Sequence, residues 1–428
     1  MLPSGVRVVV LRDRSAPVVA ARAVWIGGGS GETGDAIGMT RLLAAAWTGG
    51  CGGLDPEALA RELAADGASM AGFAGREVVG LRAEWTRAGW ERGLDLLADC
   101  VTSPRFSSSA IERARRREAE LEGESSSPAW AALDLLDQAL RPGAAPATSS
   151  LAEHADSAQL LEHLRAHCPT PAMTLAIVGD VDPDRVLARA RARFGSAPRA
   201  GPPDRPASAS ASVSASASTS VPALAPAGPG PDLELYRHLA GGRDVAAVAV
   251  GFAAVARAHR DRAALEVAAE LMGGAPGALL LADAHAGYIA LHRTCRTGDV
   301  SAALASLHRA AERLRDPGAS EEEVRRAAGR LAQARRDALA RAPQAAGLLA
   351  LYEALGPGAD GAARHADALA AVRAADVRAA AKRYLRPDAE VIATAMPLLA
   401  SPGAARRMRG VARPPPRHPE RPERRRRR

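Results

Sequence analysis

A long run of small residues and prolines divides this chain into two parts. Residues 201–231, GPPDRPASASASVSASASTSVPALAPAGPGP, alternate alanine and serine between clusters of proline and glycine. Such a segment buries too little apolar surface to offset the entropy lost on ordering, so it predicts a flexible linker. The chain has 428 residues, enough for a well-buried core on each side of the linker. We therefore expect one folded domain over residues 1–200 and a second over residues 232–401.

The end of the chain is a second segment that cannot form a core. Residues 404–428 hold eleven arginines and two glutamates. This end alone therefore carries a larger positive charge than the formal net charge of +8 of the whole chain. A charge block broken by prolines predicts a disordered tail over residues 402–428. The remainder of the chain is close to neutral, which argues against a basic surface for nucleic acid.

Hydrophobic patterning before the linker predicts a mixture of strands and helices. Two β-branched runs, at residues 6–13 and 17–26, are separated by a short polar turn and predict an antiparallel pair of strands. A helix is expected at residues 36–48. Another is expected within residues 54–67, where Asp-Pro begins the apolar period and glycine ends it. Residues 77–85 predict a further strand.

The same pattern recurs near the linker and beyond it. Residues 173–195 predict a buried strand, a turn and an amphipathic helix. After the linker, residues 244–255 predict a strand, residues 260–274 a helix that ends at two glycines, and residues 321–342 a long helix. Two tethered α+β units of similar size follow from this order.

The cysteines and the apolar runs bear on where such a chain would reside. Cys51, Cys100, Cys168 and Cys295 form no C-x-x-C pair, so we expect isolated core cysteines rather than a disulfide framework or a zinc ribbon. No apolar run approaches about eighteen residues, so no membrane span is predicted. The chain opens on a strand pattern rather than a signal peptide, which predicts a cytoplasmic protein. If the true start lies upstream, a periplasmic or exported protein is expected instead.

Four stretches occur in an order that is typical of one family. These are LPSGVRVVVLRDRSAPVVAARAVWIGGGSGET, SPRF, HLRAHCPTPAMTLAIVGDVDPDRV and LEVAAELMGGAPGALLLADAHAGYIA. Together they resemble the pitrilysin/insulinase (inverzincin) zinc peptidases over residues 2–397. The resemblance implies an α+β fold of two tandem homologous α/β-sandwich halves, like the mitochondrial processing peptidase, with a linker between them. It also implies that the last stretch forms a helix, a Gly-Gly turn and a following helix.

The helix after the Gly-Ser turn is where active members of this family carry H-x-x-E-H. Two histidines bind zinc there, and the glutamate is the general base for the bound water. Setting GMT at residues 38–40 against the family's motif places Arg41 and Ala45 at the histidines and Ala44 at the glutamate. A distal glutamate normally completes the site, and Glu120 or Glu122 would be its counterpart. The resemblance therefore implies a degenerate zinc motif with no bound cofactor.

The second domain of active pairs supplies an arginine and a tyrosine that grip the substrate. The resemblance places Asp283 and Ala290 at these positions, so both functional groups are missing. Tyr288 lies close enough in sequence to compensate as a substrate contact. An ordinary packed tyrosine is the alternative.

The segment GASMAGFAGREVVGL resembles the family's edge-strand region, where a peptide substrate adds a strand through backbone hydrogen bonds. Ala71 is then the small residue that lets a substrate backbone approach, and Met70 and Phe73 flank the groove. The alternative is that residues 69–75 only pair with residues 77–85 as a closed hairpin.

One other group of residues has metal-binding spacing. His163 and His167 are four apart on a predicted helix, but no glutamate follows the first histidine as a hydrolytic H-E-x-x-H requires. His154 is the nearest further candidate. Surface or interface histidines are the alternative to a metal pair.

Three functions remain open on this sequence. The first is a non-catalytic subunit that forms the substrate chamber of a zinc peptidase heterodimer, with an intact sister subunit and a peptide or unfolded protein as partners. The second is an active zinc metalloendopeptidase with an atypical ligand set, using His163, His167 and Glu120 or Glu122. The third is a stand-alone peptide-binding or assembly protein.

Overall fold

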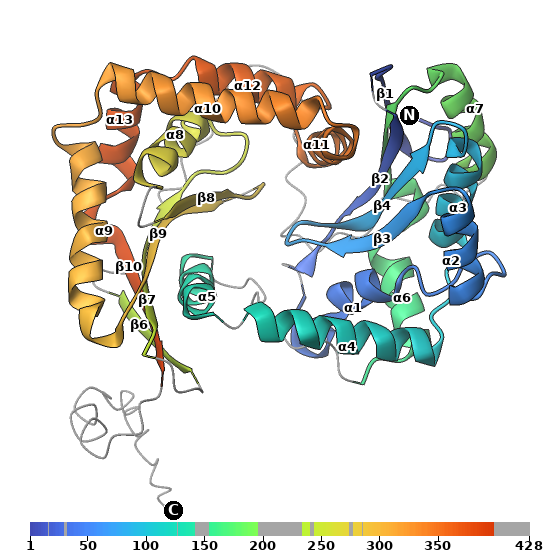
Figure 1. Cartoon of the computed structure of the whole chain (residues 1–428), viewed down its shortest axis with the longest axis horizontal. Helices are drawn as coiled ribbons and strands as arrows, with labels where there is room; N and C mark the ends of the chain where they lie inside the picture. Colours follow the sequence, from blue (N-terminus) through green and yellow to red (C-terminus); the bar gives the residue numbers. More distant parts are fainter. Residues whose placement is uncertain are drawn as a thin grey trace, which may run out of the picture.

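The computed structural model describes residues 1–15, 17–29, 32–125, 127–141, 154–195, 233–239, 244–273, 277–284 and 286–397. It is a mixed α/β structure with two five-stranded sheets side by side, each with helices on its outer face (Figure 1). We call residues 1–195 the first half and residues 233–397 the second half. The predicted fold class is confirmed, whereas the predicted linker, the tail and the exact domain boundaries lie outside the described residues.

The first sheet has the strand order β1-β5-β2-β4-β3. Its strands are β1 (Arg7–Arg12), β2 (Val18–Ile26), β3 (Ser69–Ala74), β4 (Val78–Thr86) and β5 (Thr174–Gly179). The prediction that the first two strands pair with each other is wrong, because β5 lies between them, parallel to β1 and antiparallel to β2. Every residue of β5 is buried, and a fully buried strand belongs inside a sheet, where neighbours cover both its edges.

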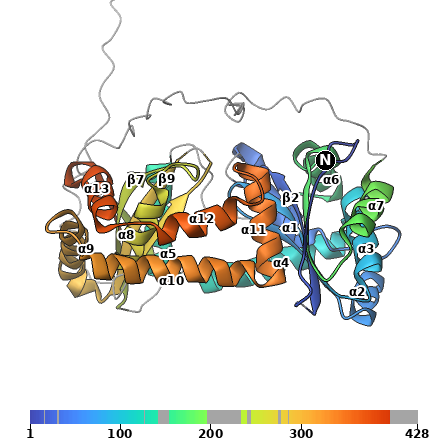
Figure 2. The ribbon, with the colours of Figure 1, turned by 90° about the horizontal axis from the view of Figure 1, so that it is seen from above.

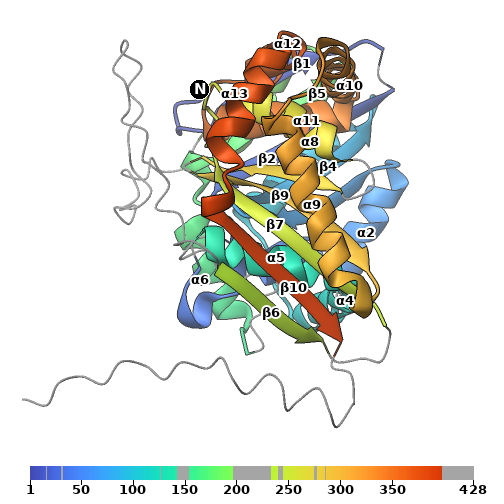
Figure 3. The same ribbon diagram turned by 90° about the vertical axis from the view of Figure 1, so that its left-hand side faces the viewer.

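The second sheet repeats this topology. Its strands are β6 (Leu233–Leu239), β7 (Ala246–Ala254), β8 (Ala278–Ala282), β9 (Gly287–Cys295) and β10 (Glu390–Pro397). The order is β6-β10-β7-β9-β8, and only the pair of β6 with β10 is parallel, just as only β1 with β5 is parallel in the first sheet. Figure 3 shows β6, β10 and β7 side by side. The two halves are therefore structural repeats, as the resemblance implied.

Helices cover the outer face of each sheet. In the first half they are α1 (Met39–Ala46), α2 (Pro56–Ala65), α3 (Trp90–Thr102), α4 (Ser108–Ser125), α6 (Ser157–His167) and α7 (Pro183–Phe194). In the second half they are α8 (Arg262–Met272), α9 (Val300–Arg315), α10 (Glu321–Leu339), α12 (Gly361–Ala370) and α13 (Ala374–Tyr384). Local signals set their starts: Asp55 caps α2 by accepting the N–H of Ala58 at 2.7 Å, and Ser320 with Glu323 forms a capping box on α10. The expected helices and strands at these places are confirmed.

Each half lends one helix to the inner face of the other half's sheet. The helix α5 (Pro128–Leu140) follows α4 in the first half but packs on β7, β9 and β10 of the second sheet. In return α11 (Ala342–Leu355) packs on β2 and β5 of the first sheet, through a cluster rich in alanine. Figures 1 and 2 show both helices between the two sheets. The halves are thus interlocked rather than simply tethered.

One expected helix is a strand. Residues after the Gly-Gly turn, expected to form a helix, instead form β8, which pairs with β9 as an antiparallel hairpin. The three leucines of β8 pack on both faces of the second sheet, two in the cluster beneath α5 and one on the opposite face, from which α8 contacts the strand.

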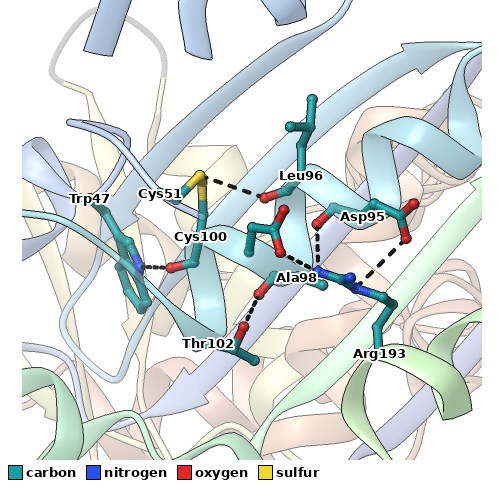
Figure 4. Close-up of a disulfide and its surroundings, with 9 residues drawn as sticks. Trp47, Cys51, Asp95, Leu96, Ala98, Cys100, Thr102 and Arg193 are labelled. Atoms are coloured by element: carbon teal, nitrogen blue, oxygen red, sulfur yellow. Dashed lines mark hydrogen bonds and ion pairs between the residues drawn. A yellow bond between two sulfur atoms is a disulfide. The ribbon is translucent and has the colours of Figure 1, made fainter. Parts of the chain in front are cut away.

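The expectation of isolated cysteines is wrong for two of the four. Cys51 and Cys100 are joined by a disulfide although 49 residues separate them (Figure 4). Cys51 lies in the loop after α1, and α3 brings Cys100 beside this loop, where Trp47 donates a hydrogen bond to the Cys100 carbonyl at 3.0 Å. Cys168 and Cys295 are free thiols. Spacing along the chain could not reveal a contact that only the packing of α3 creates.

Within the described part of the chain, no helix is both long enough and apolar enough to cross a membrane.

Candidate functional site

The helix α1 begins at a buried carboxylate. Gly38 precedes it with a φ of 86°, a conformation that glycine adopts without strain. Glu32 is buried and accepts the N–H groups of Gly38 at 2.8 Å and Thr40 at 2.6 Å. A carboxylate at a helix N-terminus satisfies free N–H groups and complements the positive end of the helix dipole. The Gly-rich turn therefore fixes where α1 starts and which way it faces.

Other side chains occupy the three positions at which active members of the family carry two histidines and a general base. Arg41 donates from Nε to Glu118 Oε2 of α4 at 2.6 Å, and both side chains are partly buried. Ala44 is buried and Ala45 is half-buried, so each offers only a methyl group. These residues do not fit a zinc ion, because a guanidinium repels a dication and a methyl group cannot ligate one.

Glu118 is the residue that sequence reasoning missed. The distal glutamate was sought at Glu120 or Glu122, and the structure shows a contact with α1 at Glu118. Glu120 is exposed, and the side chain of Glu122 lies outside what the structure describes. Residues four apart share a helix face, so Glu122 implies position 118 as a second candidate on that face. That spacing could have identified Glu118.

The histidine pair lies on α6, against the start of α1. His163 is buried, and its Nε2 lies 3.0 Å from the Thr40 hydroxyl oxygen. The ring of His167 is 4.3 Å from that of His163. Throughout the described ranges, no group of three or more His, Cys, Asp or Glu side chains is arranged to hold a metal ion. His154 is exposed. His163 therefore belongs to the packing between α1 and α6 and is not a surface residue.

Burial makes this contact sensitive to acid. Desolvation, and next the charge of nearby His167, lower the pKa of His163 from 6.5 to about 4. Because the folded state disfavours the charged imidazole, stability should be constant above pH 6.5 and fall as the pH drops from 6.5 toward 4. Urea unfolding measured across this range checks the prediction. A His163→Gln variant should lose this part of the pH dependence, and an identical pH slope in both proteins would contradict it.

The strand β3 lies at the edge of the first sheet, next to α1. Its one strand neighbour in the described sheet is β4, and α1 packs across it. A Cβ on Gly72 would meet the Ala44 carbonyl oxygen at 2.0 Å, so only glycine permits this approach of strand and helix. Helix α1 therefore adjoins the edge strand of the first sheet. The hairpin of β3 with β4 is confirmed, and peptide binding at the other side of β3 stays a prediction.

The ladder shows which residues face the open edge. Gly75 donates to the Val78 carbonyl, and these two residues are opposite each other in the hairpin register. Hydrogen-bonded pairs alternate with non-hydrogen-bonded pairs along an antiparallel ladder, so Ala71 points its N–H and C=O at β4. Met70, Gly72 and Ala74 point theirs outward. The backbone groups of Ala71 are therefore engaged with β4, and the expected role of its small side chain beside a peptide stays a prediction.

The two expected flanking residues lie on opposite faces. Met70 packs against the outer core with α1, whereas Phe73 contacts the cluster around α11. Positions three apart in a strand cannot share a face. The prediction that both flank one groove is therefore wrong.

The residues expected near the substrate in the second half are structural in this conformation. Tyr288 is 4% exposed and packs beneath α5, where burial, and next the charge of Asp137, raise the pKa of its hydroxyl. Ala290 is buried in β9. Asp283 forms an ion pair with Arg141 of α5. A substrate contact for Tyr288 stays a prediction.

Charged groups join the halves at the tips of the two edge hairpins. Asp137 of α5 forms an ion pair with the Arg141 guanidinium, with 2.6 Å between their closest atoms. It also pairs with Arg76 from the turn between β3 and β4. In that same turn Glu77 pairs with Arg257 of the second half. The open edge of β3 is therefore held in place from one end by the second half.

Comparisons with known proteins agree with this geometry. The family model described as "Insulinase (Peptidase family M16)" matches residues 7–147, and the model described as "Peptidase M16 inactive domain" matches residues 154–331. A crystal structure of a peptidase M16 inactive domain from Pseudomonas fluorescens is 19% identical, with a TM-score of 0.77 over 93% of this chain and 97% of that chain. A protease from Helicobacter pylori is 14% identical, with a TM-score of 0.77 over 93% of this chain and 98% of that one. The comparison with curated proteins finds no match.

Proposed function

This chain belongs to the insulinase family of peptidases, M16, and on that premise we propose that it binds extended peptides without cleaving them. It would act as the non-catalytic subunit that forms part of the substrate chamber of a zinc peptidase heterodimer. The observation that carries this proposal is the ion pair of Arg41 with Glu118, because the family resemblance assigns position 41 to a zinc-binding histidine. The open edge of β3 beside it retains the backbone groups that bind a peptide.

The partner in this proposal is a sister subunit with an intact H-x-x-E-H motif. Affinity purification of the chain from its own cells, followed by mass spectrometry, tests for it. Recovery of such a zinc peptidase in a stable complex supports the heterodimer. Recovery of the chain alone, with peptide binding intact, would favour a stand-alone binding protein instead.

The disulfide bears on the compartment. We propose that the protein matures in an oxidising compartment, because Cys51 and Cys100 are bonded and both are buried. Of the two locations that the sequence left open, this favours the periplasmic or exported one over the cytoplasm. Thiol alkylation of protein taken directly from cells, with and without prior reduction, distinguishes bonded from free cysteines.

Peptide binding at the β3 edge is tested by removing one outward N–H. The variant Ala74→Pro removes such a donor at an exposed position of an edge strand, which tolerates proline. We expect the affinity for a fluorescein-labelled extended peptide to fall about tenfold, as loss of one hydrogen bond and added crowding imply. Fluorescence anisotropy measures the affinity, and mass spectrometry of the same peptide should show no cleavage.

Two variants control this test. Ala74→Val keeps the N–H and should bind like the wild type. Ala71→Pro removes a donor that faces β4, so it should damage the hairpin itself and lower the melting temperature. Unchanged binding in a correctly folded Ala74→Pro protein would rule out the edge of β3 as the binding site.

A further inference from the structure

The inner face of the first sheet carries two arginines directly opposite each other. Arg22 of β2 and Arg82 of β4 are register partners. Gly27 donates to the Glu77 carbonyl in the same ladder, so alternation makes the pair of Arg22 with Arg82 a non-hydrogen-bonded one. Side chains in such pairs are the closest in a sheet, and like charges there are destabilising.

The two guanidinium groups differ in their surroundings. Arg22 is half-buried beneath α11, where a Cβ on Gly347 would lie 3.7 Å from its Nε. Burial lowers the pKa of Arg22, Glu84 opposes this effect, and Arg82 adds to it. Among the residues that the structure describes, no carboxylate lies within 4.0 Å of either arginine. With Glu84 acting on Arg22, Arg82 is the exposed positive charge of this pair.

That charge lies toward the open edge. Arg82 is exposed and lies between Arg22 of β2 and Ala71 of β3 in the register, so repulsion from Arg22 favours conformations in which its guanidinium extends over β3. The residue opposite Arg82 on β3 is Ala71, whose methyl group leaves the path above the strand clear. A strand added to the edge of β3 would lie two strand spacings, about 9.6 Å, from β4. Extended arginine and glutamate side chains can meet across that span.

We propose that Arg82, positioned by Arg22 and reaching across Ala71, selects a carboxylate on the peptide that binds the edge of β3. This rests on the proposed function and names its substrate class, an extended peptide with an acidic side chain or a free C-terminal carboxylate. Arg82 makes the contact, and Arg22 is a positioning residue. Binding of the carboxylate relieves the repulsion between the two arginines, which supplies the selectivity.

Three labelled peptides test this assignment by fluorescence anisotropy. They share one valine- and threonine-rich sequence, with a central Glu and an amidated end, a central Gln and an amidated end, or a central Gln and a free carboxyl end. We expect the wild-type chain to bind at least one carboxylate peptide about tenfold more tightly than the neutral one, or about 1.4 kcal/mol. The first and third peptides distinguish a side-chain carboxylate from a chain-terminal one.

The variants assign the preference to Arg82. Arg82→Gln and Ala71→Leu should each abolish the preference, so that the carboxylate peptides bind no more tightly than the neutral one to the same variant. Arg82→Lys, which keeps the charge, should retain most of the preference. Arg325→Gln, an equal loss of charge at an exposed position on α10, should change nothing. In the absence of peptide, Arg82→Gln should raise the melting temperature, because it removes the repulsion; a structural role for Arg82 would lower it.

The outcomes separate this inference from the proposed function. Equal affinity of the wild-type chain for all three peptides would overturn the selectivity and leave edge binding standing. A preference that persists in Arg82→Gln would overturn the role of Arg82. No saturable binding of any of the three peptides would overturn both the selectivity and the peptide-binding function.

Discussion

Replacing Asp137 with alanine should destabilise the protein by about 3–5 kcal/mol, because it breaks a buried ion-pair network between the halves. The side chains of Asp137 and Arg141 are 3% and 7% exposed, and their closest atoms are 2.6 Å apart. Asp137 also holds Arg76 and hydrogen-bonds the buried hydroxyl of Tyr288. Its removal takes this acceptor from Arg76 and from the Tyr288 hydroxyl and leaves Arg141 with Asp283 alone, in a place that water barely reaches. Urea unfolding, followed by circular dichroism, measures the loss.

The chain contains a matched control for this prediction. Asp360 and Arg364 form the same pair at the same spacing on a helix, but their side chains are 71% and 56% exposed. Asp360→Ala should therefore cost less than about 1 kcal/mol. Equal losses in the two variants would show that the network at Asp137 does not join the halves.

The topology was only partly predictable from the sequence. The β-branched runs and helix caps identified most elements, and the family resemblance supplied the tandem arrangement. The predicted pairing of β1 with β2 was wrong. Two β-branched runs joined by a short turn have the same sequence pattern whether they pair with each other or whether a third strand, here β5 from residue 174 onward, lies between them. The exchange of α5 and α11 was equally hidden, since an apolar helix face does not reveal which sheet it covers.

The contacts of the candidate site were not predictable from the sequence, and the loss of zinc binding stays a prediction. The motif positions Arg41, Ala44 and Ala45 could be read directly from the sequence. That Arg41 pairs with Glu118 depends on how α4 crosses α1, and the disulfide depends on how α3 meets the loop after α1. Contacts between elements distant in sequence are set by packing, and no local pattern encodes them. The face that carries Arg22 and Arg82 became visible only with the register of the sheet.

Restoring the motif with Arg41→His, Ala44→Glu and Ala45→His together should convert this chain into a zinc-binding protein. Arg41 Nε lies 2.6 Å from Glu118 Oε2, and a histidine ring nitrogen extends about as far from the backbone. Two histidines four apart on α1 face α4 together, so Glu118 completes a set of three ligands. Atomic absorption after dialysis should find about one zinc per chain in the triple variant and none in the wild type.

The third ligand can be identified by adding one further change to the triple variant. Glu118→Gln should abolish zinc uptake, because a neutral amide replaces the carboxylate that faces α1. Glu120→Gln should leave uptake intact, since residues two apart on α4 lie on different faces and Glu120 is exposed. Circular dichroism of each variant verifies that it is folded. Zinc uptake that survives Glu118→Gln but is lost with Glu120→Gln would show that α4 turns a different face toward α1 from the one that the contact of Arg41 with Glu118 indicates.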